Sequence, residues 1–207
     1  AADTRLREER QNANDAVVAM VPEIQSMLER VADLNGRIIA SDSQAPANDL
    51  RDQRDQLLLD LSQKIGVQRF EELNGSLTVL TGGGHTLVER ELVHSLSVSP
   101  DSSNPFDPTT ARVMYDPGTG PLDITADIGS GELSGLLRVR DTLAPDAIRS
   151  LDVLAYNAAL NLNTVHRAGY GRDGTTGNDF LTAAAGVEDS AQALSLSAAV
   201  AASTDAI

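Results

Sequence analysis

The sequence contains no cysteine and no tryptophan, and aromatic residues make up only 3% of its 207 residues. A chain without cysteine has no disulfide, no thiolate nucleophile and no thiolate metal site. Its apolar residues are mainly alanine, leucine, valine and isoleucine, which favours thin helical layers over a thick globular core. No apolar run approaches the ~20 residues that a membrane-spanning helix needs, and no signal peptide is recognisable. We therefore expect no membrane insertion.

Basic residues are scarce as well. The chain has 16 Lys and Arg residues against 30 Asp and Glu residues, which gives a formal net charge of -14. Such a surface repels phosphate backbones, so nucleic acid is not an expected partner. The first residue is Ala1 instead of Met, and it already belongs to a helical pattern. We expect the chain to be an excised fragment that lacks both terminal segments.

Two helical patterns occupy the first 66 residues. Apolar residues from Ala13 to Ile38 step by three and four, which is a heptad seam and predicts a helix from about residue 3 to residue 40. Pro22 lies inside this pattern and predicts a bend in the helix instead of its end. After a loop, Asn48 or Asp49 is predicted to cap a second helix that Gly66 terminates. Together they predict an antiparallel hairpin.

The periodicity of apolar residues changes to two after residue 66. It predicts strands over residues 67–73, 76–81, 85–89, 92–98, 111–115 and 122–128. Asn74-Gly75 joins the first two strands, because both residue types tolerate the positive φ of a tight hairpin turn. These strands predict a small, mostly antiparallel β region inserted after the helical hairpin.

Helical periodicity returns at Gly131 and predicts a short helix to about Thr142 and a long one from there to His166, separated near Pro145. A Gly- and Asp-rich loop, a short strand over 193–197 and a helical end follow. The predicted fold class is α+β: an elongated helical bundle of long antiparallel helices with an inserted, mostly antiparallel β region. We divide it into rod-domain helices over 1–66, the β region over 67–130, a returning rod helix over 131–170, and a loop with a truncated rod segment over 171–207.

The seams predict which residues hold the helices together. The predicted helix-packing core consists of Val17, Met20, Ile24, Met27, Val31, Leu34, Ile38, Leu50, Leu57, Leu61, Leu151, Leu154 and Leu162. The charged face of the second helix is predicted to make subunit contacts through Arg51, Asp52, Arg54 and Asp55. Exposed charge pairs contribute little singly, but they set register and partner choice.

Few groups of residues offer chemistry. The tract Gly82-Gly83-Gly84 lacks the lysine and hydroxyl of a phosphate-binding loop and precedes a strand, so a turn is favoured. The three histidines do not form a pattern that predicts a zinc site. Glu71 and Glu72 are adjacent on a strand and point to opposite faces, so they form no local dyad. We predict no catalytic residue, no metal site, no cofactor and no enzyme.

Three sets of local strings resemble the family of flagellar hook-associated protein 1 (FlgK). They are ADLNGRI at 32–38 with LRDQRDQLL at 50–58, GELSGLL at 131–137 with Arg140-Asp141, and NTVHRAGY at 163–170 with Gly174 and Gly177-Asn178-Asp179-Phe180. They occur in the family's order and cover most of residues 12–207. Leu181 departs from the second phenylalanine that the family often has. No large second β insertion follows, so the outer domain of longer members is expected to be absent.

The resemblance implies a structural subunit of the bacterial flagellum, an adaptor at the hook-filament junction that assembles on the hook tip after type III export. It implies an extracellular location and no catalytic activity. The implied partners are further copies in a junction ring, hook protein, hook-associated protein 3, and an export chaperone that binds the missing C-terminal end. The Gly/Asp loops leave open one alternative, an extracellular carbohydrate- or calcium-binding adhesin module, although Asp173 and Asp179 lack the ligand pattern of an EF-hand.

Overall fold

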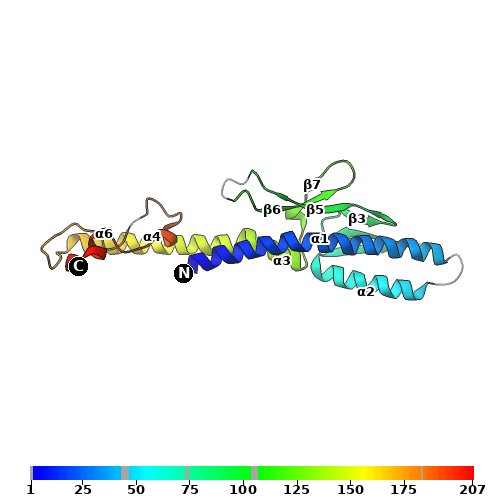
Figure 1. The fold of residues 1–207 in the computed structure, drawn as a ribbon, viewed down its shortest axis with the longest axis horizontal. Helices are drawn as coiled ribbons and strands as arrows, with labels where there is room; N and C mark the ends of the chain where they lie inside the picture. Colours follow the sequence, from blue (N-terminus) through cyan, green and yellow to red (C-terminus); the bar gives the residue numbers. More distant parts are fainter. Residues whose placement is uncertain (1, 43–46, 73–74, 104–106, 183) are drawn as a thin grey trace. The chain divides into compact units, whose positions relative to one another are not determined.

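The computed structural model describes residues 2–42, 47–72, 75–103, 107–182 and 184–207 (Figure 1). The fold class is α+β, as predicted, with one long helix, several shorter helices and antiparallel sheets. The chain divides into two compact units. One comprises residues 12–139, and the other comprises residues 1–11 together with residues 140–207.

Helix α1, Ala2–Asp42, carries the first predicted seam into the unit of residues 12–139. Pro22 lies inside the helix without ending it, as predicted. Whether Pro22 bends the helix stays a prediction. The seam residues of α1 are buried except for Met27, which is partly buried: Val17, Met20, Ile24, Val31, Leu34 and Ile38.

Helix α2, Asn48–Lys64, lies alongside the second half of α1 and runs back along it (Figure 1). An ion pair of 2.8 Å between Lys64 Nζ and Glu23 Oε2 joins the two helices. The predicted side-chain cap is wrong: the N-cap is Ala47, without a side-chain acceptor, and Asn48 is already helical. Asp49 lies in the first turn, where its negative charge interacts favourably with the helix dipole. The loop that contains Pro46 falls outside the described residues.

A four-stranded antiparallel sheet follows α2. Its strands are β1 (Val67–Glu71), β2 (Leu77–Thr81), β3 (Thr86–Glu89) and β4 (Leu92–Val93), in the order β1-β2-β3-β4. Gly75 has the positive φ, 79°, that the predicted hairpin turn requires, while Asn74 lies outside the described residues. On β2, Leu77, Val79 and Thr81 are buried, so one face of the sheet covers the core.

A second antiparallel sheet contains β5 (Ser95–Pro100), β6 (Ala111–Asp116) and β7 (Leu122–Asp123), with β6 in the middle. The single strand predicted over 92–98 is wrong. The N–H of His94 donates to Leu87 O in the first sheet, whereas Ser95 pairs with Asp116 in the second. The strand predicted over 122–128 ends at Asp123, and the 3-10 helix η1 (Thr125–Asp127) follows. One apolar core joins α1, α2, both sheets and the short helix α3 (Glu132–Arg138).

The short helix and the long helix predicted on either side of about Thr142 are present, and Pro145 lies in the first turn of the long one, where helices tolerate proline. The π-helix η2, Val139–Leu143, connects α3 directly to helix α4, Ala144–Ala168. A π turn contains one more residue than an α turn. In α4 the buried residues are Ala144, Asp152, Ala155, Ala159 and Asn163, so the heptad phase predicted for Leu151, Leu154 and Leu162 is not kept.

In the unit that contains α4, the C-terminal segment consists of short elements: α5 (Ser190–Ala193), α6 (Ala198–Ala202) and η3 (Thr204–Ala206). The strand predicted over 193–197 is wrong, since only Leu196 pairs, in an isolated bridge with Leu181. The predicted helical end is present in α6 and η3. The first turns of α1 belong to this unit, where Arg7 forms ion pairs with Asp3 and Asp189.

Candidate assembly surfaces and their supporting contacts

Three side-chain amides of α1 hold the β region through its backbone. Each accepts a hydrogen bond from a different strand. The bonds are Ala111 N to Asn14 Oδ1 (2.8 Å), Leu96 N to Gln25 Oε1 (2.8 Å) and Leu77 N to Asn35 Oδ1 (3.2 Å). We call these the amide contacts. The sequence gives no sign of them, because a polar residue on a helix ordinarily belongs to the solvated face.

Arg54 was predicted to be an exposed subunit contact, and this is wrong because its side chain is only 2% exposed. Its Nη1 donates to Asn35 Oδ1 at 2.9 Å and to Gly75 O at 2.8 Å. Its Nη2 forms an ion pair with Glu71 Oε1 at 3.3 Å. Arg54 therefore connects α2 with α1 and with the turn between β1 and β2. Its neighbours in the pattern stay at the surface: Arg51 is half-buried, Asp52 is exposed, and Asp55 pairs with Arg69.

The core residues predicted for α2 and for α4 differ in how far they are buried. On α2, Leu57 and Leu61 are buried, and Leu50 is partly buried and packs against the core. On α4, Leu151 is partly buried. Leu154 is 66% exposed and Leu162 is 42% exposed, so neither belongs to the core of this chain. Each of the three leucines comes one residue before a position that the unit buries, at Asp152, Ala155 and Asn163, so the buried face is rotated by about 100° from the predicted one.

A different face of α4 is buried, and it carries Asp152, Ala155, Ala159 and Asn163. The two polar residues hold the returning C-terminal segment by its backbone. Asp152 accepts hydrogen bonds from Asp189 N (3.2 Å) and Ala191 N (2.8 Å), at the start of α5. Asn163 accepts from Phe180 N and Leu181 N and donates to Leu181 O, at 2.9 to 3.0 Å. The two alanines between them leave room for the segment to approach closely.

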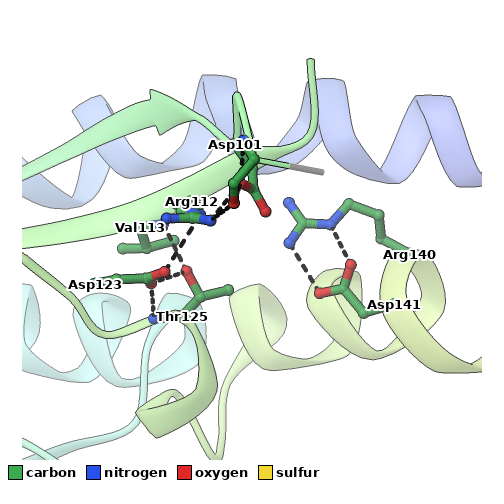
Figure 2. Close-up of polar contacts among 8 residues, drawn as sticks. Asp101, Arg112, Val113, Asp123, Thr125, Arg140 and Asp141 are labelled. Atoms are coloured by element: carbon green, nitrogen blue, oxygen red, sulfur yellow. Dashed lines mark hydrogen bonds and ion pairs between the residues drawn. The ribbon is translucent and has the colours of Figure 1, made fainter. Parts of the chain in front are cut away.

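A charged cluster connects β6 and β7 of the second sheet with Asp101, which follows β5 (Figure 2). Arg112 lies between Asp101 and Asp123, and it forms ion pairs with both. Hydrogen bonds from Ser103, together with Arg112, hold the pKa of Asp101 below its ordinary value. Asp123 Oδ1 also accepts from the N–H and hydroxyl of Thr125, at 2.9 and 2.6 Å. In the other unit, Arg140 binds the two carboxylate oxygens of Asp141 at 2.7 and 2.8 Å.

The histidines make packing contacts. The rings of His85 and His94 lie 5.2 and 5.8 Å from the ring of Tyr115, and His166 lies 5.5 Å from Phe180. Within the described ranges, no group of three His, Cys, Asp or Glu side chains is arranged to hold a metal ion. In the loop after α4, Asp173 accepts from the N–H and hydroxyl of Thr175, and these bonds lower its pKa.

The same part of the chain contains no helix that is both long and apolar enough to cross a bilayer. The Gly82-Gly83-Gly84 tract forms a turn, in which Gly84 N donates to Thr81 O at 3.0 Å. Glu71 and Glu72 are directed to different partners, Arg54 and Arg90. The glycine tract and the two glutamates therefore take part in contacts that stabilise the fold.

Comparison with known proteins places this architecture in a family. A sequence profile of the flagellar hook-associated protein FlgK helical domain matches residues 1–181. Flagellar hook-associated protein 1 of Escherichia coli is 32% identical over 183 residues, which cover 86% of this chain and 33% of that protein. The protein of the same name from Salmonella typhimurium is 32% identical over 185 residues, which cover 87% of this chain and 33% of its own length.

A solved structure supports the same relationship. The flagellar hook junction protein FlgK from Burkholderia pseudomallei superposes with a TM-score of 0.73 and 28% identity, covering 88% of this chain and 33% of that one. The chain thus spans about a third of the length of the relatives that it matches. The fold, the profile and the relatives agree that the chain belongs to the flagellar hook-associated protein FlgK family.

Proposed function

We propose that this chain is a structural subunit of the hook-filament junction that assembles on the hook tip after type III export. Membership of the FlgK family supports the flagellar setting. The observation that carries a structural role is an apolar seam on α4 that its own unit leaves uncovered. The extracellular location at the junction and the absence of enzymatic activity belong to the same proposal.

This exposed seam consists of Leu154, Ala158, Leu162 and Val165, with the half-buried Leu151 before them. Val165 is 72% exposed, and Leu154 and Leu162 are exposed as described above. Their spacing of three and four residues is the pattern by which one helix packs on another. In the described part of this unit, by contrast, the buried apolar residues are mostly alanines, with Val200 as the largest. We infer that, when the subunits assemble, a helix from outside this unit packs on the exposed seam.

The partners follow from the same proposal. They are further copies of the chain in a ring, hook protein on one side and hook-associated protein 3 on the other, with an export chaperone before assembly. The separation of the chain into a helical rod, over 1–66 and 131–207, and an inserted β region, over 67–130, also remains a proposal. It is supported by the change from helix to strand after Lys64 and back to helix at Glu132.

A deletion strain tests this function. Without the protein, cells should build hooks that carry no filaments in electron micrographs and should not swim. Intact filaments on the hooks of that strain would contradict the proposal. Complementation with Leu162→Asp should fail, because a charge cannot enter a helical seam. Leu122→Asp is a matched control, since Leu122 is an exposed leucine as well but lies on β7, and this variant should restore swimming.

A further inference from the structure

Helix α4 carries a second exposed apolar stripe, formed by Val153, Tyr156 and Leu160. Leu160 is 50% exposed, Val153 is exposed and Tyr156 is half-buried. At 3.6 residues per turn, this second stripe lies on roughly the opposite side of α4 from the exposed seam. A single helix that packs on the seam therefore cannot reach the second stripe. The second stripe needs a partner of its own.

The surroundings of the second stripe indicate what that partner presents. Beside it lies a cavity of about 100 Å³, lined by Tyr156, Ala159, Leu160, Asn163, Arg167 and Ala184. It has room for one aliphatic side chain. Arg149 lies one turn before Val153 on the same side, is exposed, and has no ion-pair partner among the residues that the structure describes. Arg167, at the other end, is already paired with Asp179. The stripe therefore fits an apolar side chain with an acidic residue near it.

Helix α2 presents such a face. Leu59 is 55% exposed there, and Asp55 and Asp52 precede it by one and two turns on the same side. Asp55 is engaged with Arg69, but Asp52 has no ion-pair partner in the described part of the chain. The exposed Leu59 with its acidic neighbours on α2 therefore complements the cavity on α4, which lies on the same side of that helix as the basic Arg149.

We propose that the second stripe of one copy binds α2 of a second copy, with Leu59 in the cavity and Asp52 paired with Arg149. This rests on the proposed function and names the contact between neighbouring subunits of the ring. The two surfaces differ from each other and belong to the same chain, so the contact is head-to-tail, and such contacts generate a ring when the rotation between copies closes. Asp52 precedes Leu59 by seven residues and Arg149 precedes Leu160 by eleven. Parallel helices therefore place the two charges about one turn apart, within reach of an arginine side chain.

Cysteine cross-linking tests the contact directly, because the chain has no cysteine of its own. The variant that combines Leu59→Cys with Leu160→Cys is expressed in the deletion strain, and its isolated flagella are oxidised. Dimers and higher multimers on a non-reducing gel are expected, and neither single variant should give them. Leu59→Cys with Asn161→Cys is the matched control, since the next residue on α4 is rotated by about 100° and should not cross-link.

Charge reversal gives a second, independent measurement. Arg149→Glu should lower the cross-link yield by roughly two- to five-fold, which is the range of an exposed ion pair, and adding Asp52→Arg should restore it. Filaments that form normally without the Leu59–Leu160 cross-link would overturn the contact and leave the junction role intact. If the cysteine pair prevents assembly, swimming in soft agar decides: a smaller swimming zone with Arg149→Glu that adding Asp52→Arg restores supports the contact, and an unchanged zone or no recovery overturns it. Intact filaments in the deletion strain would instead overturn the junction role.

Discussion

Arg54 Nη1 donates a 2.9 Å hydrogen bond to Asn35 Oδ1, and both side chains are buried. The same Asn35 oxygen accepts Leu77 N, and Asn35 Nδ2 donates to Leu77 O and Arg90 O at 2.8 Å. One pair of side chains thus connects α1, α2 and the strands of the first sheet. Its bonds reach mainly backbone groups, so neither partner can be lost without leaving buried peptide groups unpaired.

The first prediction concerns Arg54→Met. This variant should lose about 1–3 kcal/mol of unfolding free energy, because it leaves the buried Gly75 O without its donor and Asn35 Oδ1 with one donor fewer. Urea denaturation of the purified chain measures the loss. Arg69→Met is the control, since the Arg69–Asp55 pair is exposed and should be worth no more than about 1 kcal/mol. Equal losses for the two variants would mean that Arg54 is not an internal connector.

The coupling between the two buried residues is the second prediction. In a double-mutant cycle, Asn35→Ala and Arg54→Met should each destabilise strongly, and the double variant should lose less than their sum. The coupling expected for residues in one network is about 0.5–3 kcal/mol. Additive losses would show that the two side chains act separately. Gln25→Ala, in place of Asn35→Ala, gives the reference cycle, because Gln25 binds another strand and should be additive with Arg54→Met.

The seams give a third prediction. Leu61→Ala should cost about 2–5 kcal/mol in the isolated chain, since Leu61 is fully buried. Leu154→Ala should change the unfolding free energy by less than about 0.5 kcal/mol, as surface substitutions do. The same thermal or urea unfolding experiment measures both. A large loss for Leu154→Ala would show that the isolated chain already covers its exposed seam.

Asp152 supplies the fourth prediction. Asp152→Ala removes both acceptors at the start of α5, so the amides of Asp189 and Ala191 should exchange with solvent at least about tenfold faster. Hydrogen exchange measured by NMR would resolve both amides. Leu96 and Ala111, in the other unit, should keep their exchange rates. Asp146→Ala, an exposed change in the first turn of α4, is the control and should leave Asp189 and Ala191 protected.

Acid stability is the fifth prediction. The pKa of Asp101 is lowered in the fold by Ser103 and Arg112, so its ionised form stabilises the folded state above the ordinary aspartate pKa of about 3.9. That contribution is lost as the pH falls through this value and below. The melting temperature should therefore drop less steeply from pH 5 to pH 3 in Asp101→Asn than in the unchanged chain. Parallel pH profiles would contradict the role of this cluster.

Burial could be predicted from the sequence where its cause is local. Ile24 and Leu61 are buried where a continuous helical period places them, and period-two alternation located most strands. Arg54 could not be assigned, because its partners Asn35, Gly75 and Glu71 come from other elements, 17 to 21 residues away. The identity of a buried arginine's acceptors is a property of the folded chain, and a charged helical face gives no sign of it.

The exposure of Leu154 and Leu162 could not be predicted for a different reason. The heptad spacing around Leu154 is real, but the segment that follows α4 packs on the neighbouring face and is bound there by Asp152 and Asn163. That face consists of alanines and polar side chains, which an apolar pattern does not single out. The second stripe on α4 was missed for a related reason, since one seam had already explained the helical period.

The amide contacts of α1 have a consequence for how the β region can vary. The side-chain oxygens of Asn14, Gln25 and Asn35 accept hydrogen bonds from the peptide N–H groups of Ala111, Leu96 and Leu77, and every residue except proline has such a donor. These three hydrogen bonds therefore do not restrict the side chains at Leu77, Leu96 and Ala111, whereas the apolar core does, because all three are buried in it. The exposed positions of the strands can vary without loss of the amide contacts, as long as the three peptide groups keep their places along α1.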